Sequence, residues 1–177
     1  MLRSTLYLCL IASLLLLPAC GGASETKTPE PAATPDAAAP APTANPHVGT
    51  WTLNVAKSSY SPGPAPKSQT LKIDAWGEDG LTYVADGVGG DDKPTHSEFQ
   101  AKFDGKDYEF KGNPDGDMLS YKQIDPNTLE ATVKLKGAPV ITANIVVSAD
   151  GKTRTVTQTG KNAAGKDLKI TSVYEKQ

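Results

Sequence analysis

Short runs in which apolar and polar residues alternate recur throughout residues 47–177. The clearest run covers residues 129–135, where four aliphatic side chains alternate with Glu130, Thr132 and Lys134. Residues two apart on a β-strand face the same side, so this pattern predicts strands with one face in a core. No segment shows a convincing helical period. The apolar members of the other main runs are Trp51, Leu53 and Val55; Leu71, Ile73 and Ala75; Leu81, Tyr83 and Ala85; Phe99, Ala101 and Phe103; Tyr108 and Phe110; Leu119 and Tyr121; and Leu168, Ile170 and Tyr174.

Short segments rich in Gly, Asn and Asp separate these runs, for example at 76–80, 113–117 and 149–152. Such residues supply the backbone angles of tight hairpins. About ten strands joined in sequence order make an up-and-down antiparallel meander, which exposes an open edge unless it closes on itself. We therefore predict an all-β domain over 47–177 that forms an up-and-down antiparallel β-barrel of about 8–10 strands. A two-sheet sandwich is the alternative.

The first 20 residues predict a secretory signal. One basic residue, Arg3, precedes an apolar stretch from Leu6 to Leu17, which is too short to span a bilayer. The sequence Leu17-Pro18-Ala19-Cys20 resembles the bacterial lipoprotein signal, which implies that residues 1–19 are removed and that Cys20 carries the lipid. The alternative is an ordinary signal peptide that happens to end near a cysteine.

The lipoprotein resemblance implies a place in the bacterial cell envelope. Two or three acyl chains hold a protein stably to a membrane, so lipidated Cys20 would anchor the chain without a spanning helix. By analogy with lipoprotein sorting, Gly21 after the cysteine favours the outer membrane, facing the periplasm; without an outer membrane the protein would lie on the cell surface. Residues 20–46 are rich in Pro and Ala and predict a disordered tether, with a Pro-rich recognition motif as the alternative.

Charge and motifs argue against several classes of function. The 20 acidic and 18 basic residues nearly balance and are scattered, so no basic stripe suggests nucleic acid. His47 and His96 are the only histidines and lack further ligands at metal spacing, and His96 with Glu98 is interpreted as an exposed strand face. No nucleophile elbow or phosphate loop occurs. We therefore expect no enzyme activity, no cofactor and no metal site.

The two ends of the domain carry a family resemblance. Gly49-Thr50-Trp51 resembles the Gly-x-Trp signature on the first strand of lipocalins and fatty-acid-binding proteins. The closing segment is similar to the last strand of intracellular fatty-acid-binding proteins, in which an Arg-x-Tyr pair holds a ligand carboxylate. Tyr174 matches the tyrosine, whereas Ser172 stands at the arginine position. The Pro-rich segment 54–67 cannot form the two helices of that family. The whole domain looks more like bacterial lipocalin-like modules.

The lipocalin resemblance also implies a structural role for Trp51, which would close one end of the barrel beneath an arginine. Arg154 is the only arginine after Arg3, and alternation places it on the inward face with Val156. We expect its guanidinium to stack over the Trp51 indole. The alternative role for Arg154 is to bind the anionic group of a ligand.

Polar residues on the predicted inward faces are the remaining indication of function. A buried polar group needs a partner in the protein, in water or in a ligand. We therefore expect a cavity for a small hydrophobic or amphipathic molecule, with a docking surface for a protein or glycan on the outside of the barrel as the alternative function. The inward-facing polar candidates are Tyr83, Tyr121, Gln123, Asn144, Arg154, Gln158, Ser172 and Tyr174.

Overall fold

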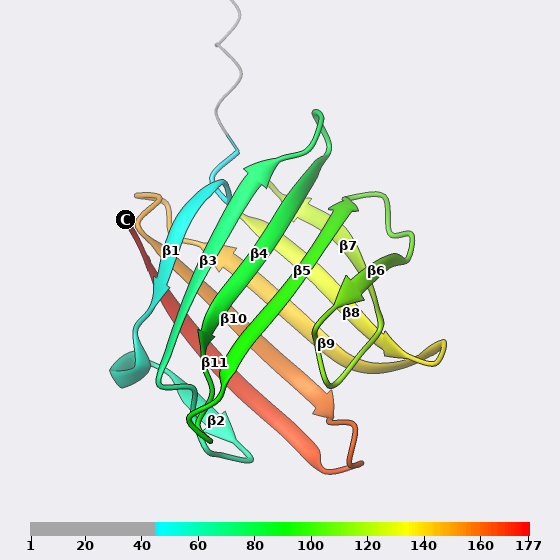
Figure 1. Cartoon of the computed structure of the whole chain (residues 1–177). Coiled ribbons are helices and arrows are strands. Elements are labelled where there is room, and N and C mark those ends of the chain that lie inside the picture. The colour runs from blue at the N-terminus through cyan, green and yellow to red at the C-terminus, as the bar shows by residue number, and fades with distance from the viewer. Residues whose placement is uncertain (1–44) are drawn as a thin grey trace, which may run out of the picture. The chain divides into compact units, whose positions relative to one another are not determined.

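The computed structural model describes residues 45–177, and the predicted signal sequence, Cys20 and nearly all of the predicted tether lie outside the described residues. The elements follow one another as short strands with a single 3-10 helix (Figure 1). In chain order they are β1 (Gly49–Leu53), η1 (Val55–Lys57), β2 (Ser59–Ser61), β3 (Ser68–Ala75), β4 (Gly80–Val88), β5 (Pro94–Lys102), β6 (Tyr108–Lys111), β7 (Met118–Asp125), β8 (Thr128–Leu135), β9 (Ala138–Val147), β10 (Thr153–Lys161) and β11 (Asp167–Lys176).

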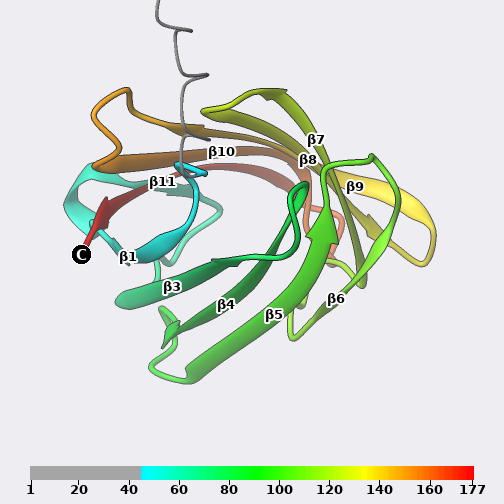
Figure 2. The same cartoon turned by 90° about the horizontal axis from the view of Figure 1, so that it is seen from above.

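Ten of these strands form a closed antiparallel barrel, which confirms the predicted fold class. Each strand from β3 to β11 pairs with the next in sequence, and β1 pairs with both β3 and β11. The closing register places Trp51 opposite Lys176 and Leu53 opposite Tyr174. Seen from above, β3–β5 lie across the interior from β8, β10 and β11 (Figure 2). The sandwich alternative is wrong because the first and last strands pair.

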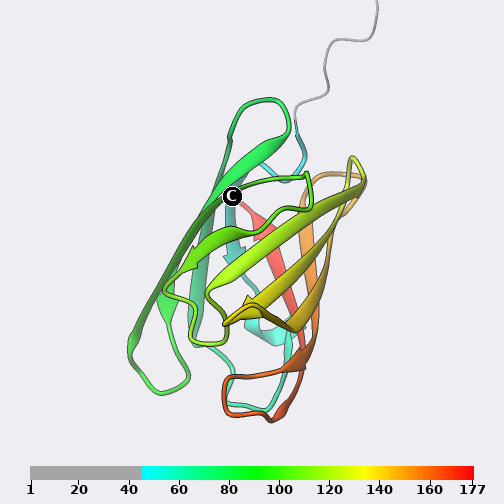
Figure 3. The same ribbon diagram turned by 90° about the vertical axis from the view of Figure 1, so that its right-hand side faces the viewer.

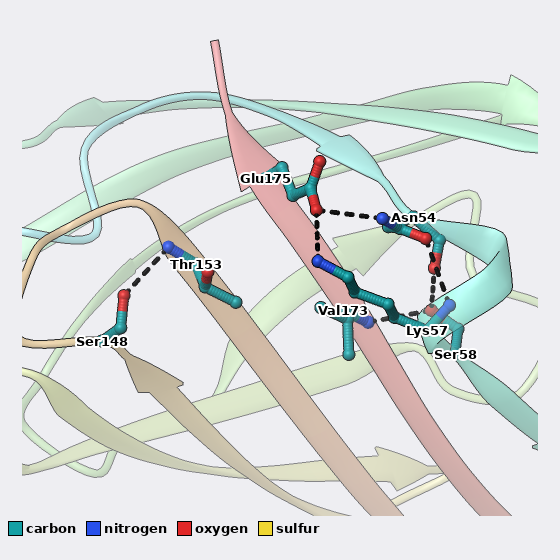
Figure 4. Close-up of polar contacts among 7 residues, drawn as sticks. All are labelled: Asn54, Lys57, Ser58, Ser148, Thr153, Val173 and Glu175. Atoms are coloured by element: carbon teal, nitrogen blue, oxygen red, sulfur yellow. Dashed lines mark hydrogen bonds and ion pairs between the residues drawn. The ribbon is translucent and has the colours of Figure 1, made fainter.

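The N-terminal segment pairs twice with β11, through β1 and through β2. Polar residues in the turn between these two strands form hydrogen bonds with β11. After β1, Asn54 caps the turn of η1 by accepting a hydrogen bond from the Lys57 amide at 3.1 Å. The chain then returns as β2, whose Ser61 lies opposite Lys169. Glu175 of β11 accepts bonds from both Asn54 and Lys57 at 2.9 Å, and Ser58 Oγ accepts from the Val173 amide (Figure 4). The predicted inward position of Val55 is wrong: the turn leaves Val55 39% exposed.

Two residues with positive φ explain the two-residue hairpin between β8 and β9. Lys136 and Gly137 are the only residues between β8 and β9, with φ angles of 53° and 82°. Positive φ at both central positions is the geometry of a type I′ turn, whose twist matches that of paired strands.

The part of the sheet with the fewest strand-to-strand pairs is β6, which shares only two register pairs with β5 and two with β7 (Figure 3).

The core is packed most closely at one end of the barrel. β1 starts there and β11 ends there, next to the first residues of β8 and β10 and the last residues of β9. The largest side chains that are less than 2% exposed include three aliphatic residues at this end, Ile73, Leu129 and Val147, together with Trp51, His47 and Arg154. Tightly packed side chains therefore close this end, which we call the closed end.

Candidate functional site: the barrel cavity

The barrel encloses a cavity of about 600 Å³. Apolar side chains from neighbouring strands form much of its wall, and two of them, Ala131 and Ala143, are small residues directly opposite each other on β8 and β9. Away from the closed end the cavity reaches exposed residues of β5, Pro94 and Thr95, and Pro114 in the β6–β7 connection. The apolar wall comprises Leu71, Phe99, Phe110, Leu119, Ala131, Val133, Ile141, Ala143, Ile145, Val156, Leu168 and Ile170.

Aromatic side chains organise one wall. The Tyr83 and Phe99 rings, which are cross-strand neighbours on β4 and β5, stack with centroids 4.5 Å apart. Phe110 and Tyr121 meet Phe99 edge to face at 5.1 and 5.5 Å. Aromatic pairs in these geometries are worth about 0.5–1.5 kcal/mol beyond their buried area. These four aromatic residues therefore form one wall of the cavity.

Most of the predicted inward-facing polar residues lie where alternation places them. Six of the eight line the cavity: Tyr83, Tyr121, Arg154, Gln158, Ser172 and Tyr174. They come from β4, β7, β10 and β11, which lie on both sides of the interior. The structure therefore brings residues from distant parts of the sequence around one space.

The inward positions expected for Gln123 and Asn144 are wrong, because both side chains are exposed and neither lines the cavity. The pairing of β7 with β8 shifts register between Gln123 and Asp125, so alternation from Tyr121 stops there. Asn144 lies in a run that is apolar on both faces. Pairing with β8 and β10 turns Ala143 and Ile145 inward and leaves Asn144 outside.

Two polar contacts inside the barrel involve residues that the sequence interpretation missed. Tyr60 of β2 shares a hydrogen bond of 2.9 Å with Ser172, and the Tyr174 hydroxyl donates to Gln69 Oε1 at 2.6 Å. Gln69 is two residues before Leu71, so continued alternation would have found it. The inward position of Tyr60 could not be predicted, because the prolines that follow it interrupt the alternation of apolar and polar residues. The hydroxyls of Ser172 and Tyr174 are therefore already paired within the protein.

At the closed end, Arg154 contacts a histidine rather than a tryptophan. Arg154 Nη1 lies 2.9 Å from His47 Nδ1, and the His47 carbonyl accepts a bond of 3.0 Å from the Trp51 indole. The cation over the Trp51 ring is Lys176, with its Nζ 5.0 Å from the ring centroid. The predicted stacking of Arg154 on Trp51 is thus replaced by Lys176. This residue is opposite Trp51 in the register, and a Cβ at Gly49 (φ 135°) would lie 2.7 Å from Lys176 Cε.

His47 is the most strongly perturbed histidine. Its side chain is fully buried, and burial, with the nearby Arg154 charge, lowers its pKa from 6.5 to about 3. The imidazole is therefore neutral at physiological pH. A guanidinium can only donate hydrogen bonds, so Nδ1 of His47 must accept and the proton must lie on Nε2. This Nε2 has no hydrogen-bond partner among the described residues.

The cavity tyrosines are neutral hydroxyl groups. Burial is the main cause that raises the pKa of Tyr83, Tyr121 and Tyr174, and the Arg154 charge opposes this rise at each of them. Arg154 therefore lies close enough to all three tyrosines to lower their pKa slightly. The cavity thus has an apolar wall, neutral hydroxyls and one cation.

Outside the barrel, a second hollow of about 470 Å³ lies against β4, β5 and β6. Trp76 and Tyr108 meet there edge to face at 6.2 Å, among charged residues such as Glu98 and Lys111. Nearby, exposed His96 shares a 2.7 Å hydrogen bond with Asp86, which raises the pKa of His96.

Within residues 45–177, no three His, Cys, Asp or Glu side chains lie close enough together to hold a metal ion. In the same range, no helix has the length and apolar character needed to cross a bilayer.

Comparison with known proteins yields a fold and no family. No family model matches the sequence, and no curated protein matches it. A solved structure of a single-residue mutant of the fluorescent protein UnaG is similar with a TM-score of 0.52, at 19% identity over 75% of this chain and 96% of that one. At this level of identity the likeness shows the fold alone, a closed antiparallel β-barrel. A zebrafish ileal bile acid-binding protein complexed with cholic acid gives a TM-score of 0.45, at 12% identity over 75% of this chain and 99% of that one.

Proposed function

We propose that the barrel binds a small hydrophobic or amphipathic molecule in its cavity and acts as a carrier without catalytic activity. The cavity itself is the observation that supports this function: about 600 Å³ of space with an apolar wall and a few polar groups. Binding pockets for small molecules typically have about 300–1,000 Å³ and this mixture of lining residues. A barrel built only for structural support would fill this space with side chains, because protein interiors are packed nearly as tightly as organic crystals.

The way into the cavity supports reversible binding. The only helix in the described part of the chain is the single turn of η1, and it lies beside β11. Residues at the accessible end belong to strand ends and connections, including Pro94, Thr95 and Pro114. Within residues 45–177 no helix covers the accessible end, so a ligand can enter and leave without displacing one.

Substitution of Ala143 tests the binding site. Ala143 of β9 lines the cavity, so the Ala143→Phe side chain would project from β9 into the cavity space. We expect the wild-type barrel to bind the uncharged fluorescent probe N-phenyl-1-naphthylamine, and A143F to bind it at least about 10-fold more weakly, a loss of about 1.4 kcal/mol. A fluorescence titration of the purified barrel measures both affinities, and circular dichroism verifies the fold.

The matched control is Asn144→Phe, which adds the same ring one residue further along β9, on the outer face. We expect this variant to bind the probe as the wild type does. If A143F kept full affinity in the folded state, the probe would be binding elsewhere, and the outer hollow at Trp76 would become the better candidate. If the wild type bound no probe, the carrier function would be wrong.

We further propose that the carrier is a bacterial lipoprotein, anchored through Cys20 to the outer membrane with its barrel in the periplasm. The proposal depends on the Leu-x-Ala-Cys sequence after the apolar stretch, which lies outside the described residues. With no other cysteine after Cys20, a single thiol accounts for the attachment. A carrier held at a membrane would exchange its ligand close to the lipid phase.

A Cys20→Ala variant tests the anchor. We expect the wild-type chain, expressed in a Gram-negative host, to partition into the detergent phase of a Triton X-114 separation. The variant should move to the aqueous phase, since the energy of burying two or three acyl chains is lost. Mass spectrometry of the wild-type N-terminal peptide should show the added lipid mass. If C20A remained with membranes, the lipoprotein assignment would be wrong.

A further inference from the structure

The outer hollow lies where two neighbouring strands stop pairing. Figure 1 shows β4, β5 and β6 one after another around the barrel. β5 and β6 share only the register pairs Glu98–Lys111 and Phe99–Phe110, and pairing between the two strands ends there. Phe99 and the aliphatic Val84 of β4 supply an apolar part of the hollow's lining. Its volume of about 470 Å³ is within the range of small-molecule pockets, about 300–1,000 Å³.

Two aromatic rings with fixed orientations line this hollow. Trp76 and Tyr108 meet with their centroids 6.2 Å apart and their planes at 89°. The Trp76 amide donates to the Gly80 carbonyl at 3.0 Å, and the indole packs against Gly80, where a Cβ would lie 3.2 Å from Trp76 Cε3. The Tyr108 hydroxyl donates to Asp104 Oδ2 at 3.1 Å. The two half-buried rings therefore form a preformed aromatic corner.

Charged groups of both signs line the hollow beside the rings. Lys111 Nζ lies 3.8 Å from Glu98 Oε1 and 3.8 Å from Glu109 Oε2. Both separations exceed the length of a hydrogen bond. On β5, Gln100 Nε2 donates to Thr82 Oγ1 at 3.1 Å, which fixes the amide of another lining residue. The ammonium and the two carboxylates therefore keep hydrogen-bonding capacity for a ligand.

This lining favours a neutral ligand that both donates and accepts hydrogen bonds. An anion would meet two carboxylates, whereas a cation would meet Lys111 and also Lys102, whose Nζ is 6.0 Å from the Trp76 ring centroid. A hydroxyl group can donate to a carboxylate and accept from an ammonium at the same time. The aromatic corner requires an apolar surface in addition. A sugar ring offers both, because its C–H groups form an apolar face and its hydroxyl groups surround the edge.

We propose that the outer hollow binds a neutral saccharide. The sugar ring packs against Trp76 and Tyr108. Its hydroxyl groups form hydrogen bonds with Glu98, Glu109 and Lys111. This site goes beyond the carrier function and does not depend on it. Among the described residues, Phe99 is the only one that lines both the hollow and the barrel cavity.

Four probes test the ligand class by isothermal titration calorimetry on the wild-type protein. The β-1,4-linked tetramers of glucose and of N-acetylglucosamine are neutral, and the tetramer of glucuronic acid has the same linkage and is anionic. Tetramethylammonium tests the alternative of a cation held by the aromatic rings. We expect at least one neutral tetramer to bind at least about 10-fold more tightly than the anionic tetramer and than tetramethylammonium.

Two variants locate the site. Trp76→Ala removes one ring and should weaken saccharide binding at least about 10-fold. Glu109→Gln keeps the shape and removes one charged acceptor, so it should weaken binding about 3- to 10-fold. The matched control, Glu130→Gln, removes the same charge from an exposed position on β8, across the interior from β4 and β5 (Figure 2). This control should bind as the wild type does, and circular dichroism verifies the fold of each variant.

Tryptophan fluorescence provides a second readout. A bound sugar should shield Trp76 from the quencher acrylamide, while Trp51 is completely buried with or without it. If neither neutral tetramer bound the wild type, or if the anion or the cation bound more tightly than both, the saccharide class would be wrong. A neutral tetramer that kept its full affinity in folded W76A and E109Q would place the binding site elsewhere and overturn the role of the hollow.

Discussion

Replacement of Trp51 by Ala is expected to destabilise the barrel by about 3–5 kcal/mol, the range found when a fully buried large aromatic residue is truncated. Trp51 is completely buried, its indole donates to the His47 carbonyl at 3.0 Å, and Lys176 covers its ring. It also belongs to the strand that closes the barrel against β11. Because small domains are stable by only about 5–15 kcal/mol, the loss would be a large part of the total. Chemical denaturation followed by circular dichroism measures it.

Trp76→Ala is the matched control, since Trp51 and Trp76 are the only tryptophans. Trp76 is half-buried outside the barrel, at the outer hollow, and its main aromatic contact is the edge of Tyr108. We expect this variant to lose less than half as much stability as W51A. Equal losses would mean that the closed end contributes no more to stability than an outer loop, contrary to the packing of the buried residues there.

Acidification should destabilise the protein because of His47, even before its carboxylates become protonated. The pKa of His47 falls from 6.5 in the unfolded chain to about 3 in the barrel. Between these values the unfolded state binds the extra proton, so stability declines as the pH falls from about 6.5 toward 3. The His47 contribution between pH 7 and pH 4 is about 3 kcal/mol. Denaturant titrations at half-unit pH intervals measure this dependence.

The His47→Gln variant isolates this contribution. Its amide oxygen can accept the hydrogen bond from Arg154 and does not titrate in this range. Above pH 7, H47Q is expected to be the less stable protein, and the wild type should lose its advantage as the pH falls to 4. If the difference between wild type and variant were the same at pH 7 and pH 4, His47 would not be buried in its neutral form.

The barrel could be predicted from sequence because its strands lie next to each other in chain order. Alternation identified the buried face of nearly every strand, from Leu71 and Ile73 on β3 to Leu168 and Tyr174 on β11. Turn residues then placed most boundaries, and the need to protect an open edge predicted closure. Such local signals were sufficient for β3 to β11, which pair in sequence order, but they did not predict β2, which pairs with β11.

The errors arose where alternation stops or carries no information. The turn after Asn54 takes Val55 out of the core, the register shift at Gln123 ends the pattern on β7, and Asn144 lies among residues that are apolar on both faces. Contacts between distant segments were also missed. Nothing in the residues around His47 shows that it will meet Arg154, because this contact depends on how β1 and β10 approach each other.

The double pairing of β11 with β1 and β2 has a consequence for the order of folding. The final ten-residue strand supplies the hydrogen bonds that seal the N-terminal segment at both Leu53 and Tyr60, more than 100 positions earlier in the chain. Until that strand is present, a partly synthesised chain carries two unpaired edges, the condition in which β-proteins associate with one another. The barrel therefore cannot close before β11 has been synthesised.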